Sequence, residues 1–215
     1  MNLKLVAVLR VVAKAATKTL YRGVQDIYPS QVNHNYIGEG VFGNGTYFAR
    51  DYDTAEDYAK GGIYSTDDYE LFGLVMEYKA TFTNLLMVSE DHLEGLESGE
   101  HTNYLKMSEE GLEVFEYEQP ISFPATELTR RMADDGWDGI FLIADNSGVP
   151  DGGEQLIIPP GSKVKPVLQK VTFIFESERA EEFAKKMKLK PIDEWSVEVS
   201  KAKLKQAEKA LRAMF

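Results

Sequence analysis

The pattern of apolar and polar positions along the chain predicts a mixture of strands and helices. The segments "TLYRGV" (19–24) and "GTYFA" (45–49) are short apolar and aromatic runs that are typical of strands. Between them, residues 25–42 are rich in glycine and asparagine and are expected to form a loop. The segment "TAEDYAKG" then predicts a helix capped by Asp53 or Thr54, with acids in its first turn and a glycine after its end.

The rest of the chain continues this mixture. The segment "YELFGLVMEYKATF" (69–82) predicts a strand with a bulge at Gly73. Residues 124–136 have the start signal and the stop glycine of a helix, residues 137–145 read as a buried strand, and residues 154–167 as a strand that bends at two prolines. The tail of the chain predicts strand, helix, strand and helix in that order. We therefore expect an α+β fold.

The length and composition of the chain limit the number of domains and the kinds of site that it can form. With 215 residues, of which 43% are hydrophobic, the chain can form one domain with a buried core and an added subdomain. It contains no cysteine, which excludes a disulfide framework, a thiolate nucleophile and a cysteine-based zinc site. The three histidines, His34, His92 and His101, lack the spacing of metal ligands, so we expect no metal.

The formal net charge of −11 is unevenly distributed. Residues 89–118 contain ten acidic residues and one lysine, whereas residues 161–215 contain thirteen basic and eight acidic residues. The negative sign disfavours non-specific binding of nucleic acid, which depends on neutralising phosphates. The acidic stretch is interpreted as a solvated surface, with docking of a basic partner as the alternative.

The N-terminal residues 1–18 are basic and partly apolar, and we expect them to form a helix or an edge segment. Arg10 and Lys14 interrupt the apolar run, so the segment lacks the hydrophobic region of a signal peptide. No apolar run approaches the length of a transmembrane helix. The expected location is the cytoplasm, either of the producing cell or of a targeted cell, without a membrane span.

Three short glycine-containing motifs carry charged or aromatic side chains that could act on a ligand. They are Arg22 in "LYRG", Tyr47 and Tyr58 in "GNGTYFARDYDTAEDYA", and Glu154 in "GGEQLIIPP". Singly, each has an ordinary explanation as a surface arginine, a packed tyrosine or an exposed acid. In this order, the motifs resemble those of the ADP-ribosyltransferase family, whose members cleave NAD at the nicotinamide–ribose bond. The segment "ADDGWDGIFLIAD" is also similar to the late part of bacterial and phage members, and the resemblance covers about residues 19–167.

The resemblance implies roles for these residues. Tyr47 and Tyr58 would flank the nicotinamide ring, a flat cation that favours the π face of an aromatic side chain. The backbone of Gly23 would pair with the carboxamide, a close approach that the missing Cβ permits. Arg22 would contact the ribose or the pyrophosphate. Glu154 would accept hydrogen bonds from the ribose hydroxyl and stabilise an oxocarbenium-like transition state.

The implied site has NAD as substrate, no metal, and two departures from the family pattern. The implied catalytic residues are Glu154, Arg22 and Tyr47, and the implied NAD-binding residues are Tyr21, Arg22, Gly23, Gly45, Thr46, Tyr47, Phe48 and Tyr58. Gly152 occupies the position where arginine-modifying members have Glu or Gln, so arginine is not indicated as the target. An arginine on the first strand is combined with a tyrosine-type second strand, which gives a hybrid Arg-Tyr-Glu motif.

The resemblance also implies an architecture and an activity. The expected fold is a split antiparallel β-sandwich with peripheral helices over residues 19–167, followed by a C-terminal strand-helix extension over 168–215. The expected activity is mono-ADP-ribosyl transfer to a macromolecular acceptor, a protein rather than a nucleic acid, by a bacterial or phage effector. The alternatives are an NAD glycohydrolase, and a non-catalytic binding module that uses the acidic stretch or the basic tail. An RNA 2′-phosphotransferase shares the broad fold, but the acidic middle of the chain disfavours it.

Overall fold

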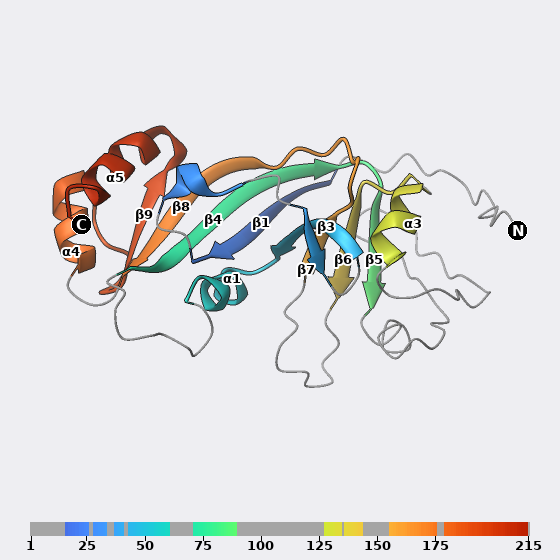
Figure 1. The fold of residues 1–215 in the computed structure, drawn as a ribbon, viewed down its shortest axis with the longest axis horizontal. Helices are drawn as coiled ribbons and strands as arrows, with labels where there is room; N and C mark the ends of the chain where they lie inside the picture. The colour runs from blue at the N-terminus through green and yellow to red at the C-terminus, as the bar shows by residue number, and fades with distance from the viewer. Residues whose placement is uncertain are drawn as a thin grey trace, which may run out of the picture. The chain divides into compact units, whose positions relative to one another are not determined.

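The computed structural model of the chain is a mixed α+β structure (Figure 1). It describes residues 16–25, 28–33, 37–40, 43–60, 71–89, 127–134, 136–143, 155–175 and 179–214. The elements, in chain order, are β1 (Ala16–Val24), η1 (Pro29–Gln31), β2 (Gly38–Gly40), β3 (Gly43–Ala49), α1 (Tyr52–Ala59), β4 (Leu71–Phe82), β5 (Leu85–Ser89), α3 (Leu128–Asp134), β6 (Gly139–Ile143), β7 (Gln155–Ile158), β8 (Val167–Phe175), α4 (Arg179–Met187), β9 (Ser196–Ser200), η4 (Lys201–Lys203) and α5 (Leu204–Leu211). The α+β class predicted from the sequence is confirmed.

The chain divides into two compact units. The first unit comprises residues 1–18, 35–47 and 80–165, and the second comprises residues 19–34, 48–79 and 166–215. Strands β1, β3 and β4 each contribute residues to both units. Residues 168–215, predicted as an extension, belong to the second unit together with β1 and α1. Residues 90–118 of the acidic stretch and residues 1–15 lie outside the described residues.

The first unit is built on the strand order β5-β6-β7-β3, with β2 paired to the start of β3. Strands β5 and β6 are parallel, with Leu85 opposite Gly139, whereas β6 and β7 are antiparallel, with Ile140 opposite Ile157. Ile140 and Ile157 are fully buried, and Met132 of α3 is also in this core. Burial of these apolar side chains is the main stabilising contribution within the unit.

A single carboxylate joins the start of β6 to the turn between β4 and β5. The Asp138 carboxylate accepts hydrogen bonds from the Thr83 amide at 2.7 Å, the Thr83 hydroxyl at 2.7 Å and the Asn84 amide at 3.0 Å. The Asp138 amide donates in return to the Asn84 carbonyl at 2.9 Å. These reciprocal hydrogen bonds act as a cap because they satisfy the polar backbone groups of the turn.

Replacing Asp138 with alanine should therefore lower the free energy of unfolding by about 1–2 kcal/mol, since a capping carboxylate typically contributes this much. Chemical denaturation of the two proteins measures the difference. Asp134→Ala is the control, because Asp134 is an exposed acid at the end of the nearby helix α3. Equal stability of the Asp138 and Asp134 variants would show that the carboxylate does not hold the turn.

The second unit is built on the strand order β3-β1-β4-β8-β9. Strand β8 is antiparallel to both of its neighbours, β4 and β9. In the observed register, Val75 of β4, Thr172 of β8 and Glu198 of β9 lie in one row across the sheet. The register shifts between Leu71 and Gly73, which confirms the bulge predicted at this glycine. The strand-helix-strand-helix order predicted for the tail is confirmed as β8, α4, β9 and α5.

The two faces of the second unit's sheet are covered by different helices (Figure 1). On one face, Phe173 and Phe175 of β8 each lie 5.1 Å from the ring centroid of Phe183 on α4. On the other face, the intervening Ile174 packs in a cluster with Ala55 of α1. Because successive side chains of a strand point to opposite faces, the alternation in β8 separates the two apolar layers.

Helix α1 begins at a cap that differs from the predicted one. The sequence predicted capping by Asp53 or Thr54, but the helix begins at Tyr52 and its N-cap is Asp51. The Asp51 carboxylate accepts hydrogen bonds from the Thr54 amide at 2.7 Å and the Thr54 hydroxyl at 2.9 Å. The correct cap lies earlier because Asp51 has an extended backbone and can reach the third residue after it.

Other expectations need smaller corrections. Residues 25–42, expected to form a loop, contain η1 and β2, which are too short for the sequence pattern to identify. Residues 16–18, expected in a helix or an edge segment, are the start of β1. Within the part of the chain that the structure describes, no helix is long and apolar enough to cross a lipid bilayer.

Candidate functional site

The predicted site residues are distributed over the two units. Gly45, Thr46 and Tyr47 belong to the first unit, whereas Tyr21, Arg22, Gly23, Phe48 and Tyr58 belong to the second. Glu154 lies outside the described residues and directly precedes strand β7. The predicted flanking of one nicotinamide ring by Tyr47 and Tyr58 therefore stays a prediction, as does the role of Glu154.

Strand β1 presents its predicted site residues on two faces. Tyr21 pairs with Ala49 of β3, which makes the two motif-bearing strands antiparallel neighbours. Tyr21 and Gly23 lie on the face that helix α1 covers, and the alternation of a strand places Arg22 on the opposite face. There the Arg22 Nη1 atom donates a hydrogen bond to the Asn33 carbonyl at 3.0 Å.

The structure gives Gly23 a packing role. A Cβ atom at Gly23 would collide with the Ala55 carbonyl and would lie 2.8 Å from the Ala59 amide nitrogen. Gly73 on β4 likewise leaves room for the backbone of Ala59. Ala55 and Ala59 are fully buried, so two small helix residues rest on two glycines of the sheet. Sequence reasoning assigned the missing Cβ of Gly23 to a ligand, whereas close approach of α1 already requires it.

Packing also accounts for two further residues of the motif. Phe48 is only 2% exposed, and its ring meets that of Tyr78 edge-to-face with centroids 5.4 Å apart. Gly45 is buried in the first unit, where a Cβ atom would lie 2.6 Å from the Ile157 Cγ2 atom. Neither residue needs a ligand to explain its identity.

The two tyrosines of the motif have different environments. Tyr47 is half-buried, and its hydroxyl donates a hydrogen bond to the Gly43 carbonyl at 2.6 Å. Tyr58 is 56% exposed on α1, one residue before the buried Ala59. Tyr58 is therefore not part of the apolar core, and its role at the nicotinamide ring stays a prediction.

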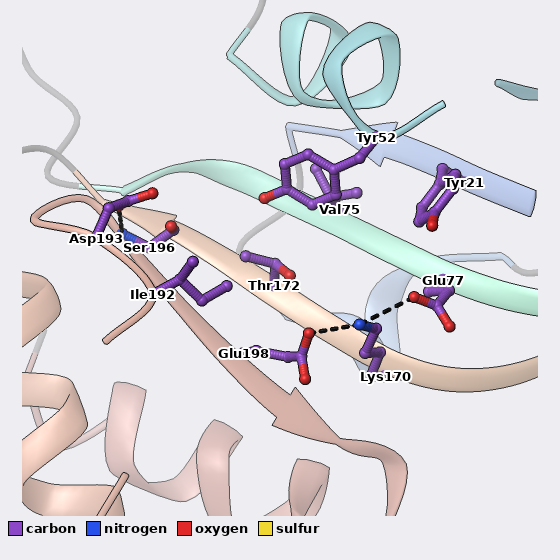
Figure 2. Close-up of a pocket in the computed structure, with 10 residues that line it drawn as sticks. All are labelled: Tyr21, Tyr52, Val75, Glu77, Lys170, Thr172, Ile192, Asp193, Ser196 and Glu198. Carbon is purple, nitrogen blue, oxygen red and sulfur yellow. Dashed lines mark hydrogen bonds and ion pairs between the residues drawn. The ribbon is translucent and has the colours of Figure 1, made fainter. Parts of the chain in front are cut away.

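A cavity of about 260 Å³ lies in the second unit, on the face of the sheet that carries Tyr21 (Figure 2). Its walls come from β1, α1, β4, β8, β9 and the segment before β9. The lining residues are Tyr21, Tyr52, Val75, Glu77, Lys170, Thr172, Ile192, Asp193, Ser196 and Glu198. Sequence reasoning had selected only Tyr21 from this set.

The aromatic wall of the cavity consists of Tyr21 and Tyr52. Their rings meet edge-to-face, with centroids 6.1 Å apart and planes at 84°. Burial, with a further contribution from Glu56, raises the pKa of Tyr52 to about 12. Burial and the charge of Glu77 also raise the pKa of Tyr21. Both phenols are therefore neutral at physiological pH and present ordinary π faces.

The opposite wall carries a row of charged groups (Figure 2). The Lys170 Nζ atom lies 2.6 Å from the Glu198 Oε2 atom and 3.0 Å from the Glu77 Oε2 atom. The hydrogen bond to Glu198 raises the pKa of Lys170, burial lowers it, and the hydrogen bond to Glu77 raises it again. The net result is a pKa of about 12. Lys170 therefore stays protonated and is already paired with two carboxylates.

A third carboxylate lies on the segment between α4 and β9. The Asp193 Oδ1 atom accepts hydrogen bonds from the Trp195 and Ser196 amides, both at 2.8 Å. Burial pushes the pKa of Asp193 up, but the hydrogen bonds from Ser196 and Trp195 outweigh this effect and hold the pKa below its usual value. The cavity is thus lined by three carboxylates and one ammonium group.

The sequence contained a signal for this wall that the motif search did not use. Glu77, Lys170 and Glu198 are charged positions in strands that alternate between apolar and polar residues, in "VMEYKA", "LQKVTFIF" and "SVEVS". Alternation of this kind indicates a strand with one polar face. The strand register that brings these three positions together on one face of the sheet could not be read from the pattern.

Comparison with known proteins adds no family assignment. No protein-family model matches the chain, and no curated protein matches it. Among the residues that the structure describes, no cluster of three or more histidine, aspartate or glutamate side chains is arranged to hold a metal ion.

Proposed function

We propose that the protein is a mono-ADP-ribosyltransferase that cleaves NAD and transfers ADP-ribose to a protein acceptor in the cytoplasm. The observation that carries the proposal is the arrangement of β1, β3 and α1. The strand with Arg22 and Gly23 is the neighbour of the end of β3, and the helix that carries Tyr58 packs directly on Gly23. Strand β1 of the first motif thus lies against the end of β3 and against α1, which both belong to the second motif.

The finer architecture belongs to the same proposal. We place the chain in the split antiparallel β-sandwich class of the family that its motifs resemble. The antiparallel pairing of β1 with β3 and of β8 with both β4 and β9 supports this class, whereas the parallel pair β5–β6 departs from an antiparallel sheet. Strand β8, which hydrogen-bonds to β4, makes the C-terminal residues part of the sheet of the second unit.

The proposed reaction breaks the bond between the ribose anomeric carbon and the nicotinamide nitrogen. The bonding electrons leave with nicotinamide, which becomes neutral, while positive charge develops on the ribose. The Glu154 carboxylate stabilises that charge through the ribose hydroxyl, and the Arg22 guanidinium neutralises negative charge on the pyrophosphate. The acceptor then attacks the anomeric carbon from the opposite face and loses a proton. The aromatic surface of Tyr58 binds the nicotinamide ring.

Incubation of wild type and Glu154→Gln with NAD and a whole-cell lysate tests the proposal. We expect wild type to release nicotinamide and to leave an ADP-ribose adduct on a protein, both measured by mass spectrometry. The variant should do neither. Release without an adduct would indicate an NAD glycohydrolase instead, and the absence of release from wild type would favour a non-catalytic binding module.

A further inference from the structure

We propose that the cavity between Tyr21, Tyr52 and the Glu77–Lys170–Glu198 row binds a small organic cation, a guanidinium or an alkylammonium group (Figure 2). Tyr21, one of the implied NAD-binding residues, lines this cavity, but the argument for a bound cation does not depend on the proposed cleavage of NAD. The inference rests on the charge of the lining, on its aromatic wall and on the size of the cavity.

The charge of the lining excludes an anion. The single basic group, Lys170, already contacts one oxygen of Glu77 and one of Glu198 at ion-pair distance. A phosphate or carboxylate would have to displace these partners and would also face Asp193. A cation is attracted instead, because Glu77 and Glu198 share the single ammonium of Lys170. Their carboxylates can therefore accept further hydrogen bonds and carry negative charge that Lys170 does not neutralise. The pyrophosphate of a dinucleotide is therefore not the ligand of this cavity.

The aromatic wall favours an organic cation over a metal ion. Tyr21 and Tyr52 lie across the cavity from the charged row, and a planar guanidinium or an ammonium group interacts favourably with such rings. Ile192, which is 57% exposed, adds an apolar surface for the carbon chain that carries the charge. Metal ions prefer several carboxylate or carbonyl ligands in a compact cluster, and no such cluster occurs among the described residues.

Two buried hydroxyl groups between the aromatic and the charged walls can also accept hydrogen bonds from an organic cation. Thr172 is 3% exposed and Ser196 is 2% exposed, yet both line the cavity. The Thr172 hydroxyl hydrogen-bonds to Tyr52 and the Ser196 hydroxyl to Asp193, and each hydroxyl oxygen retains a lone pair that can accept a further hydrogen bond. A volume of about 260 Å³ holds such a group with a short carbon chain. Pockets that take larger, drug-sized ligands run from about 300 to 1,000 Å³.

Most of the described side chains with a clearly displaced pKa line this cavity. Tyr21, Tyr52, Lys170 and Asp193, which all line it, are four of the six described groups whose pKa is clearly displaced. Their concentration in one concave site agrees with the binding function that the charge and shape of the cavity indicate independently.

Calorimetric titration with butylguanidine and with its neutral isostere butylurea tests the proposal on the full chain. We expect butylguanidine to bind and butylurea to bind at least about tenfold more weakly, since a hydrogen bond to a charged group contributes that much. End-capped pentapeptides with a central arginine or citrulline distinguish the source of the cation. Binding of the arginine peptide would indicate a protein side chain, and binding of butylguanidine alone would indicate a small molecule.

Three variants make the test specific. Glu198→Gln should weaken butylguanidine binding about tenfold, because it removes one charged acceptor. Lys170→Gln should strengthen it by a similar factor, because it removes the competing internal cation. Glu181→Gln on α4 is the control and should bind like wild type, since Glu181 is exposed outside the cavity and pairs with Lys185.

Thermal unfolding establishes that each variant is folded before titration. Equal affinity for butylguanidine and butylurea would overturn the proposal, as would the absence of binding to wild type. Loss of butylguanidine binding in folded Lys170→Gln would also overturn it, because that result would identify Lys170 as a ligand-binding group rather than a competitor.

Discussion

Replacing Gly23 with alanine should lower the free energy of unfolding by about 3 kcal/mol or more, the upper end of the range for overpacked sites. The added methyl group would collide with the Ala55 carbonyl and would lie 2.8 Å from the Ala59 amide nitrogen. Both are backbone atoms of α1, which cannot move aside as the tip of a flexible side chain can. The helix would have to shift away from the sheet and expose Ala55 and Ala59, which are fully buried.

Gly161→Ala is the matched control for this substitution. Gly161 has a φ of +80°, and a Cβ atom there would meet nothing within 4 Å, so its cost is backbone strain alone, about 1–2 kcal/mol. Chemical denaturation of both variants separates the two causes. If Gly23→Ala were no less stable than Gly161→Ala, helix α1 would not pack on β1 as described, and the arrangement that supports the proposed function would be lost.

Replacing Glu154 with glutamine should reduce the turnover of NAD by about 10²–10³-fold, as expected when a group that stabilises transition-state charge is removed. Glutamine retains the size of the side chain but loses its negative charge. Because the positive charge on the ribose develops only as the bond breaks, kcat should fall while KM changes little. Steady-state measurement of nicotinamide release gives both constants.

Glu127→Gln is the control for this variant. Glu127 belongs to the same unit, and its carboxylate pairs with Arg130 and Arg131, each at 2.9 Å. Its replacement should leave turnover unchanged. Similar loss in both variants would mean that activity depends on general stability or charge rather than on Glu154. An increase in KM at constant kcat for Glu154→Gln would assign this residue to substrate binding alone.

Local sequence patterns predicted the elements of the chain better than their assembly. The strand at 45–49 and the helix that follows it were identified because apolar spacing and capping signals act over a few residues. The order of elements in the tail was predicted for the same reason. The cap moved to Asp51 because several acidic residues stand close together, and the pattern alone does not select among them.

The cavity could not be predicted, because it depends on the register between distant strands. Glu77, Lys170 and Glu198 come from β4, β8 and β9. Only the pairing of these strands places Glu77 directly opposite Lys170, and Glu198 diagonally across from it, opposite Thr172. A shift of one residue would turn the charged side chains to the opposite face. Gly23 illustrates a related limit, because packing against a helix and approach to a ligand both require glycine. Its sequence context does not distinguish them.

The measurement that tests the central claim most directly is nicotinamide release from NAD by the purified wild-type protein, with Glu154→Gln alongside. The proposed function predicts release by wild type at a rate at least about 100-fold above that of the variant. Release at equal rates by both proteins, or by neither protein although both are folded, would contradict it.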